Sequence, residues 1–359
     1  MSALRVAIDA TPLVVPLGGT ARYVVELVAA LSAQFPNDEF HLISDQASWT
    51  LPERLGRLAN VIREPPQWRG LWGSWWTTGL PWELHRRGID LFHGTDFSVP
   101  YVPLTPSVMM IHDLSPWKQP PIRPLGSERV RHRTPYLLRI ATHIVTPTQA
   151  IRAELAATFA VSLNRITAVP LAAFDPGDHT TADEPRVTPP YILYIGALDA
   201  RKNVQTLVAA WRRARAHVND LSLVLAVPPR GEAPPDEPGL HRFAGLTDAE
   251  VTQLLSGAMA FVYPSLYEGF GLPVLEAMRT GVPVITSNDP AITEVAGGAA
   301  VQVDVTSAET LAQAILSVVT SSVAQGRLGN EGKKRAAEFS WRRTAQRTRD
   351  VYAETIERF

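Results

Sequence analysis

The sequence contains no cysteine, so disulfides, a thiol nucleophile and cysteine-ligated metals are excluded. No apolar run comes near the roughly 18–20 residues that cross a bilayer. Neither sign of charge predominates, because 34 Lys and Arg residues stand against 35 Asp and Glu residues. That balance argues against nucleic-acid binding, which usually needs a basic domain. Since Asp9 interrupts the first hydrophobic stretch, we expect no signal peptide and a cytoplasmic location.

Three motifs are also absent. No two aspartates are separated by one residue, so the Asp-x-Asp motif, which binds a nucleotide-bound metal ion, is missing. The metal-binding motif His-Glu-x-x-His is missing as well. The three spaced glycines of a dinucleotide-binding loop are missing too, which leaves an NAD-dependent dehydrogenase as a weak alternative. We therefore expect neither a metal nor an organic cofactor.

Hydrophobic patterning predicts the fold class. With 359 residues, 45% of them hydrophobic, the chain suits two domains of roughly 150–200 residues each. Apolar strands alternate with helical periodicity, which is typical of doubly wound, Rossmann-like α/β domains that bind ligands in a cleft. The predicted strands are Leu4–Asp9, Phe40–Ser44, Asn60–Arg63, Ile89–His93, Ser107–Ile111, His143–Thr146, Arg165–Val169, Tyr191–Ile195, Leu221–Val227, His241–Ala244, Met259–Tyr263, Val282–Thr286 and Ala300–Val303.

The alternation of strands and helices stops once, in a stretch rich in Asp, Thr and Pro. We place an interdomain linker there, over residues 175–188. The predicted domains are then 1–174 and 189–340. A final helix is predicted over 341–359.

A strand, a glycine-rich turn and a helix follow one another around Glu268. The strand ends at Tyr263, and the helical pattern begins at Leu272, directly after Gly271. The backbone N–H groups and the positive dipole end of such a helix bind phosphate. Glu276, one turn inside the helix, can accept hydrogen bonds from sugar hydroxyls. These residues predict a site for a phosphorylated sugar.

Two cations follow the first strand of the second domain. Arg201 can bind phosphate oxygens with two parallel hydrogen bonds, and Lys202 adds a point charge. The alternative is a solvated charge pair at a helix start. Because a second phosphate-binding element lies in the same domain, we favour binding. These two cations and the helix N-terminus near Gly271 would stabilise the leaving group without a metal.

The first domain offers two further candidates. Gly18 and Gly19 follow the first strand, where glycine lets the backbone approach a phosphate or sugar closely. The alternative is a plain strand-to-helix turn. His112 ends another strand, at the sheet edge where doubly wound folds display functional side chains. His93 ends a strand too, but we interpret it as a structural group.

Tryptophan and arginine are concentrated in the first domain. Five of the nine tryptophans fall between Trp68 and Trp82, and Trp72, Trp75 and Trp76 lie within that run. Arginines recur from Arg123 to Arg139. Tryptophan beside arginine suits lipid headgroups, so we predict reversible contact with the inner face of a membrane. A tryptophan-containing core under a solvated basic surface is an equal alternative.

These residues resemble the retaining nucleotide-sugar glycosyltransferases of family 4, which have the GT-B fold of two Rossmann-like domains facing across a cleft. The resemblance covers nearly the whole chain. Its most specific element is a pair of glutamates eight positions apart, here Glu268 and Glu276. The stretch Ile89–Gly94 resembles the mannosyltransferase-like branch. In the family, the last helix crosses back to the N-terminal domain.

The resemblance implies site roles. Glu276 would bind the nucleotide ribose, and Glu268 would hold the transferred sugar. His112 would lie near the donor sugar. The catalytic residues implied are His112, Arg201, Lys202 and Glu268. The donor-binding residues implied are Gly18, Gly19, Arg201, Lys202, Gly245, Leu246, Glu268, Gly269, Phe270, Gly271, Leu272 and Glu276.

The sequence thus predicts a metal-independent, retaining glycosyltransferase. GDP-mannose is the leading donor, and the acceptor is a glycan, a lipid-linked molecule or a small molecule. Front-face attack is implied, with the leaving phosphate taking the acceptor proton. Two alternatives stay open: a sugar-nucleotide epimerase of the same fold, and a sugar-nucleotide binding protein without catalysis.

Overall fold

A computed structural model describes residues 3–14, 18–46, 49–68, 74–118, 127–174, 187–228 and 234–359. The chain divides into two compact units, Met1–Leu171 with Ser340–Phe359, and Ala172–Phe339. The boundaries of the units, after Leu171 and after Phe339, lie close to the predicted domain ends at 174 and 340. Most of the predicted linker, residues 175–186, lies outside the described residues.

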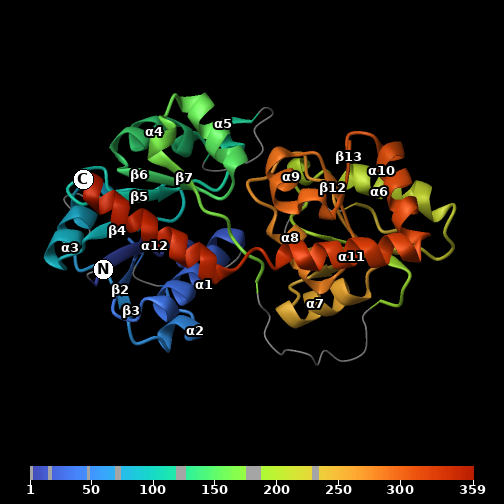
Figure 1. The fold of residues 1–359 in the computed structure, drawn as a ribbon, viewed down its shortest axis with the longest axis horizontal. Coiled ribbons are helices and arrows are strands. Elements are labelled where there is room, and N and C mark those ends of the chain that lie inside the picture. The colour runs from blue at the N-terminus through green and yellow to red at the C-terminus, as the bar shows by residue number, and fades with distance from the viewer. Residues whose placement is uncertain are drawn as a thin grey trace. The chain divides into compact units, whose positions relative to one another are not determined.

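The first unit is built on a seven-stranded parallel sheet in the order β3-β2-β1-β4-β5-β6-β7 (Figure 1). The strand order reverses between β1 and β4, which makes the carboxyl ends of these two strands the topological switch point of a doubly wound sheet. The strands are β1 (Arg5–Asp9), β2 (Glu39–Ile43), β3 (Val61–Glu64), β4 (Leu91–Gly94), β5 (Ser107–Met110), β6 (His143–Thr146) and β7 (Ile166–Ala168).

Helices cover this sheet. In Figure 1, α4 and α5 lie at the top of the unit, and α1 and α2 lie at the bottom. In α1 the side chains of Val24, Leu27, Val28 and Leu31 are fully buried, as their helical spacing requires. The helices of the unit are η1 (Thr11–Val14), α1 (Gly19–Gln34), α2 (Glu53–Gly56), η3 (Trp75–Gly79), α3 (Leu80–Arg86), η4 (Ser115–Trp117), α4 (Ser127–Ile140), α5 (Gln149–Phe159), η5 (Leu163–Arg165) and α12 (Trp341–Arg358).

The last helix, α12, completes the first unit, where it packs against α1. Ser340 caps its start by accepting a hydrogen bond from the Arg343 backbone N–H at 3.3 Å. Its Tyr352 is fully buried, and its Thr344 hydroxyl donates to the Pro170 carbonyl at 2.7 Å. The final helix therefore belongs to the core of the unit that contains β1.

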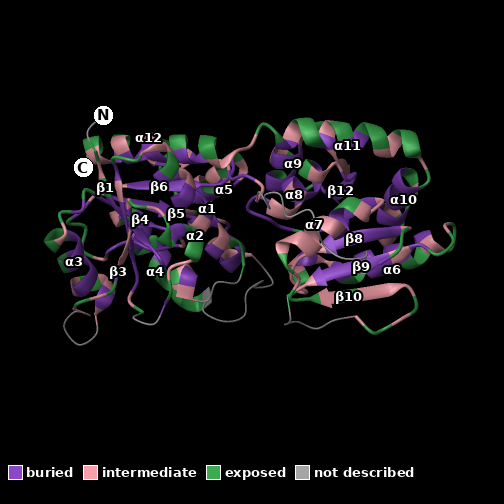
Figure 2. Ribbon diagram, turned by 90° about the horizontal axis from the view of Figure 1, so that it is seen from below, coloured by how far each residue is buried: buried purple, intermediate pink, exposed green. Residues whose placement is uncertain are grey.

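The second unit is built on a six-stranded parallel sheet in the order β10-β9-β8-β11-β12-β13. Its switch point lies between β8 and β11. Figure 2 shows β8 and β9 buried, β10 of intermediate burial, and helices with exposed outer faces. The elements are β8 (Tyr191–Ile195), η6 (Ala200–Lys202), α6 (Val204–Arg215), β9 (Ser222–Val227), β10 (Leu240–Ala244), α7 (Asp248–Gly257), β11 (Ala260–Tyr263), α8 (Leu272–Thr280), β12 (Val284–Ser287), α9 (Pro290–Ala296), η7 (Gly297–Ala299), β13 (Val301–Val303), α10 (Ala308–Val319) and α11 (Ser322–Ala336).

The predicted two-domain α/β fold is confirmed, and each predicted strand forms within two residues of its expected bounds. The apolar runs that predict strands are buried on both faces, as parallel sheets require. The two edge strands of the second sheet, β10 and β13, are exceptions, because none of their residues is fully buried.

Candidate active site

The charged residues predicted for the second domain lie at its topological switch point. Arg201 and Lys202 follow β8, and Glu268 follows β11, which pairs directly with β8. Parallel strands end at the same edge of a sheet, so the two segments meet there. The sequence separates them by more than sixty positions, and the fold brings them into contact.

Glu268 is held between both cations. The Lys202 Nζ lies 2.5 Å from Glu268 Oε1, and an Arg201 guanidinium nitrogen lies 2.8 Å from Oε2. Tyr263, the last residue of β11, donates from its hydroxyl to Glu268 Oε1 at 3.1 Å. The same guanidinium also donates to the Tyr267 carbonyl at 3.0 Å. Each carboxylate oxygen thus has a fixed cationic partner.

Burial and charge set the protonation of this cluster. Glu268 and Lys202 are each only 7% exposed. Burial raises the pKa of the Glu268 carboxyl, but Lys202 and Arg201 outweigh burial and hold that pKa below its usual value. Glu268 is therefore ionised at neutral pH. Asp199 lies 4.0 Å from Arg201, so two cations stand beside two carboxylates, and burial lowers the pKa of Lys202.

Asp289 positions Glu268, and the sequence reading missed it. Its Oδ1 caps α9 by accepting from the N–H groups of Ala291 and Ile292, each at 3.0 Å. Its Oδ2 accepts from the Glu268 N–H at 3.3 Å. Burial raises the pKa of Asp289 to about 6. The signal available in the sequence was an aspartate just before Pro290, a common helix start.

The helix α8 begins at the glycine turn. Gly271 is its N-cap, with φ at +93°, a left-handed conformation that favours glycine. No side chain caps this end, and Pro273 occupies its first turn. Phe270 is buried and packs edge-on against Phe339 at 6.0 Å between ring centroids. The uncapped N-terminus therefore directs backbone N–H groups and a positive dipole toward the sheet edge.

The remaining residues predicted to bind the donor follow the same edge. Gly269 is buried in the turn, whereas Leu272 and Glu276 on α8 are partly exposed. Gly245 and Leu246 follow the edge strand β10, and Gly245 is exposed with φ at +68°. Because β9 lies between β10 and β8, these two residues stand farther along the edge than the charged cluster.

In the first unit, Gly18 and Gly19 stand at the N-terminus of α1. Gly18 is its N-cap with φ at +104°, and both glycines are exposed. A Cβ at either position would meet no atom within 4 Å. Open space at a helix N-terminus is compatible with close approach of a ligand. Residues 15–17, which precede them, lie outside the described residues.

His112 is partly exposed and held by the loop that follows β4. Its Nε2 lies 3.0 Å from the Thr95 carbonyl, and its ring meets Tyr23 edge-on at 4.9 Å. A carbonyl oxygen only accepts, so Nε2 carries the proton, and in neutral His112 Nδ1 is the acceptor. Thr95 also donates from its hydroxyl to the Asp9 carbonyl at 2.9 Å. One loop residue therefore connects His112 to the end of β1.

His93 has the structural role predicted for it. It is fully buried, with Nδ1 2.6 Å from the Tyr352 hydroxyl and Nε2 3.3 Å from the Tyr23 hydroxyl. Burial and nearby His112 lower its pKa to about 3. It therefore stays neutral and connects β4 to α1 and α12.

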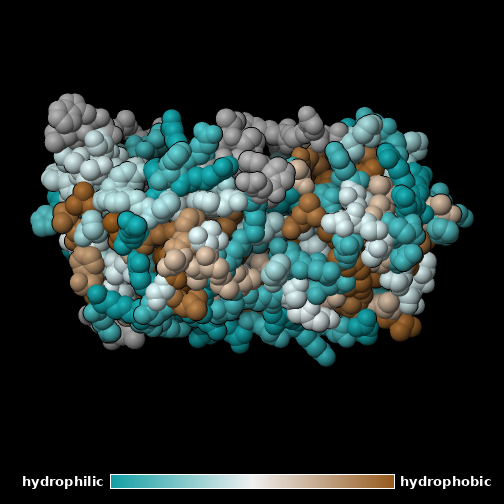
Figure 3. Space-filling view, turned by 90° about the horizontal axis from the view of Figure 1, so that it is seen from above, coloured by the Kyte–Doolittle hydropathy of each residue, from teal (hydrophilic) through white to brown (hydrophobic). Residues whose placement is uncertain are grey.

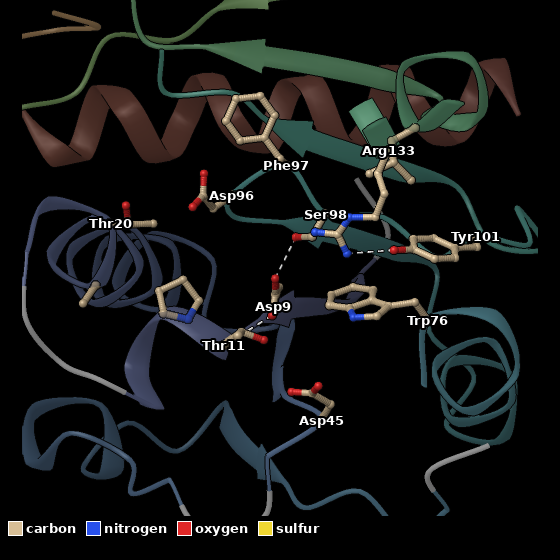
Figure 4. Close-up of a pocket in the computed structure, with 13 residues that line it drawn as sticks. Asp9, Thr11, Thr20, Asp45, Trp76, Asp96, Phe97, Ser98, Tyr101 and Arg133 are labelled. Carbon is tan, nitrogen blue, oxygen red and sulfur yellow. Dashed lines mark hydrogen bonds between the residues drawn. The ribbon is translucent and has the colours of Figure 1, made fainter. Parts of the chain in front are cut away.

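A cavity of about 420 Å³ lies at the switch point of the first unit (Figure 4). Asp9 at the end of β1 is 3% exposed and accepts from the Ser98 hydroxyl at 2.7 Å and from the Thr11 N–H at 2.9 Å. Burial and nearby Asp45 raise the pKa of Asp9. The sequence reading missed this cavity because its walls come from scattered segments, although an acid at a strand end was a signal.

The tryptophan-rich region is divided between core and surface. Trp75 is 5% exposed and Trp76 packs against the same core cluster, so the prediction that Trp75 faces lipid was wrong. The Trp75 ring fills space between η3 and the sheet. Trp82 is 41% exposed, with the Arg86 guanidinium over its ring. Trp72 and Arg123 lie outside the described residues.

The described residues contain neither a candidate metal centre nor a candidate membrane-spanning helix. No group of three or more His, Asp or Glu side chains there could hold a metal ion. No helix among them is both long and apolar enough to cross a membrane. Over the described residues, the face in Figure 3 is largely hydrophilic, with apolar side chains in small separate groups.

Comparison with known proteins identifies the class. A family model described as Glycosyltransferase Family 4 matches residues 17–173, and one described as Glycosyl transferases group 1 matches residues 189–321. The chain therefore belongs to the family 4 glycosyltransferases of GT-B fold, and it is an enzyme of that class. The predicted family and class are confirmed.

The relatives include mannosyltransferases. The chain is 27% identical to O-antigen chain mannosyltransferase B of Escherichia coli, over 97% of this chain and 99% of the relative. It is 32% identical to an MMP alpha-(1->4)-mannosyltransferase of Mycolicibacterium hassiacum, over 67% of this chain and 61% of that protein. Among solved structures, sucrose-phosphate synthase from Thermosynechococcus elongatus has a TM-score of 0.72 at 20% identity, with 98% of each chain covered.

Proposed function

We propose that this enzyme transfers a mannosyl residue from GDP-mannose to a carbohydrate acceptor, with retention of the anomeric configuration and without a metal ion. The observation that carries the proposal is Glu268 clamped by Arg201 and Lys202 beside the α8 N-terminus. The choice of mannose is supported by the two relatives that are named mannosyltransferases.

The donor groups of the cluster favour a diphosphate. Arg201 and Lys202 supply cationic N–H donors, and the uncapped α8 N-terminus adds a positive dipole end. In the proposed complex the phosphate oxygens accept hydrogen bonds from both cations and from backbone N–H groups of Gly269–Leu272. Glu268 then accepts from hydroxyls of the transferred sugar, and Glu276 accepts from the ribose. Gly245 and Leu246 lie beside the base.

The proposed step exchanges one bond for another at the anomeric carbon. The acceptor hydroxyl oxygen forms a bond to this carbon as its bond to the diphosphate oxygen breaks. The hydroxyl proton passes to the departing phosphate on the same face. Arg201 and Lys202 stabilise the negative charge that develops there, so a metal ion has no separate role.

The test is an assay with GDP-, UDP- and ADP-sugars in the presence of excess EDTA. We expect turnover of GDP-mannose in chelator, and an α-linked product by NMR from the α-linked donor. Loss of activity in chelator that Mg²⁺ or Mn²⁺ restores would overturn the metal-independent step. A β-linked product would overturn retention, and a preference for another nucleotide would replace GDP-mannose.

We further propose that the acceptor is lipid-linked or presented at an anionic membrane. Among the described residues the support is Arg129 and Arg139, which are exposed on α4, together with exposed Trp82. The test is co-sedimentation with vesicles containing anionic lipid at low and high salt. Binding that falls with salt supports this part, and no binding at low salt removes it.

A further inference from the structure

We propose that Arg335, near the end of α11, is a positioning residue for the donor site, where it closes a ring of contacts that holds the glycine turn 268–271 from two sides. This inference rests on the proposed function, because it assigns a support to the turn that receives the diphosphate. All of its contacts lie within the second unit. Arg335 acts on the backbone of the turn and not on the substrate itself.

The first side of the turn is held by α9. Asp289 Oδ2 accepts from the Glu268 backbone N–H at 3.3 Å, and Oδ1 of the same carboxylate caps the first turn of α9. A shift of α9 would therefore move Asp289, and Asp289 would move Glu268. The position of α9 thus sets the position at which the glycine turn begins.

Arg335 holds the opposite end of α9. Its Nε donates to the Val295 carbonyl at 2.9 Å, and one of its terminal nitrogens donates to the Glu294 carbonyl at 2.6 Å. The last turn of a helix leaves carbonyls without intrahelical donors, and a guanidinium offers several N–H donors in one plane together with a positive charge. Asp289 at the start and Arg335 at the end therefore suit the dipole of α9.

The second side of the turn is held by an aromatic contact. Phe270 stands between the two glycines of the turn, is 5% exposed and meets the Phe339 ring edge-on at 6.0 Å between centroids. The Arg335 guanidinium lies over the face of the same Phe339 ring, 4.9 Å from its centroid. Arg335 therefore reaches the turn by two routes, one through α9 and one through Phe339.

The helix that carries Arg335 is itself held closely against α8 (Figure 1). A Cβ at Gly329, in α11, would overlap the carbonyl oxygen of Gly281, which is the C-cap of α8. A residue without a side chain is needed for the two helices to approach this closely. The base from which Arg335 extends is therefore fixed relative to the phosphate-binding helix.

The turn needs such support because of its composition. Two of its four residues are glycines, and Gly271 has φ at +93°. Glycine restricts the backbone least, so contacts from outside have to fix the directions of the N–H groups. A turn that is ordered in advance binds a diphosphate with less loss of conformational entropy.

The first measurement is isothermal titration of the full chain with GDP. Arg335→Met keeps much of the side-chain length and removes the N–H donors and the charge. We expect Arg335→Met to weaken GDP binding about 10-fold, because the turn is no longer preorganised. Arg335→Lys keeps the charge without the planar donors, so its affinity should be intermediate. Unchanged GDP affinity in Arg335→Met would overturn the proposal.

Two controls separate positioning from a loss of stability. Glu338→Gln removes the ion pair of Arg335 with Glu338 and leaves the two carbonyl contacts, so GDP affinity should stay within about 2-fold. Val318→Ala removes buried methyl groups from α10 and should lower stability without changing GDP affinity. If Val318→Ala bound GDP as weakly as Arg335→Met, Arg335 would contribute stability alone, contrary to the proposal.

Phe339 tests the same ring of contacts independently, and it decides the question if Arg335→Met does not fold. Phe339→Leu should weaken GDP binding, whereas Phe339→Tyr keeps the ring and should bind GDP as the unaltered protein does. In the double variant Arg335→Met with Phe339→Leu, the loss of affinity should be smaller than the product of the single losses. A full product would mean that the two side chains act independently, which contradicts the proposal.

Hydrogen exchange without ligand separates this inference from the proposed function. In Arg335→Met we expect the backbone N–H groups of residues 268–272 to exchange at least about 10-fold faster, while those of β8 and β9 are unchanged. If the unaltered protein does not bind GDP but the turn exchanges faster in the variant, the donor assignment fails and the positioning role stands. GDP binding by the unaltered protein, with unchanged affinity and exchange in the variant, gives the reverse.

Discussion

Arg349 and Asp38 form a buried ion pair that ties the last helix to the residue just before β2. The Arg349 Nε lies 2.6 Å from Asp38 Oδ2, and both side chains are at most 5% exposed. Asp38 Oδ1 also accepts from the Leu4 N–H at 2.8 Å. One carboxylate thus joins α12, the entry to β1 and the entry to β2.

Arg349→Leu should destabilise the first unit by about 3–5 kcal/mol, because it leaves the Asp38 carboxylate buried without its cation. The measurement is urea unfolding, with hydrogen exchange on β1 and β2 to assign the transition to this unit. Arg347→Leu, at an exposed position on the same helix, is the control and should change stability by less than about 0.5 kcal/mol. Equal stability of the two variants would contradict the structural role of the pair.

Glu276→Ala should weaken GDP binding at least about 10-fold, because each charge-assisted hydrogen bond to a ribose hydroxyl contributes about 1.5–3 kcal/mol. Isothermal titration gives the dissociation constant. The control is Glu309→Ala on α10, an exposed glutamate whose carboxylate pairs with exposed Arg213. An unchanged dissociation constant in Glu276→Ala would remove Glu276 from the ribose site.

Arg201→Ala should lower kcat by at least about 100-fold, since it removes a donor aimed at the leaving phosphate. Lys202 still pairs with the buried Glu268 carboxylate in this variant, so the melting temperature should fall far less than activity. The experiment measures both kcat and the midpoint of thermal unfolding for the variant and for the unaltered protein. A variant that loses stability and activity in parallel would indicate that the cation serves only to neutralise Glu268.

Acid should destabilise the first unit through His93. Its pKa is lowered to about 3 in the folded unit, whereas the unfolded chain titrates near 6.5. The unfolded state therefore binds more protons below pH 6.5, and stability falls as pH drops from 6.5 toward 3. This single group contributes up to about 1.4 kcal/mol per pH unit.

His93→Gln should remove that contribution, so its stability should fall less steeply between pH 6.5 and 4. The variant will be less stable at pH 7, because the two tyrosine contacts of the imidazole are altered. Exposed His85→Gln is the control, and we expect its slope to match the unaltered protein. Identical slopes in all three proteins would show that His93 does not govern acid sensitivity.

Gly94→Ala should destabilise the first unit and lower transferase activity, because its Cβ would overlap the Ser98 backbone. The loop would have to move, and it holds both Asp9 and His112. Gly326→Ala is the contrasting change, since it lies exposed in α11 with open space around a Cβ. That substitution should leave activity unchanged and raise stability by up to about 1 kcal/mol.

The sequence predicted local features best. The segment from Tyr263 to Glu276 carries a strand, a glycine bend and a helix in one continuous stretch, so its pattern predicts both its structure and its site. The strands were equally predictable, because buried parallel strands form short apolar runs. Trp75 was mispredicted, because composition cannot show which side of η3 packs against the sheet.

The sequence could not predict features that depend on distant segments. The cavity around Asp9 takes its walls from β1, from the loops after β2 and β4, and from α4. Nothing near Asp9 in the chain indicates Ser98, which completes its hydrogen bonds. Asp289 was missed for the same reason, because its contact with Glu268 exists only once β11 and β12 pair.

The placement of α12 also bears on the order in which the chain can fold as it is made. The second unit is one continuous segment, whereas the first waits for residues 340–359 to supply Arg349 and Tyr352. The polar groups of His93 and Asp38 stay without those partners until that helix leaves the ribosome. On the ribosome, the later segment can therefore reach its final packing before the earlier one.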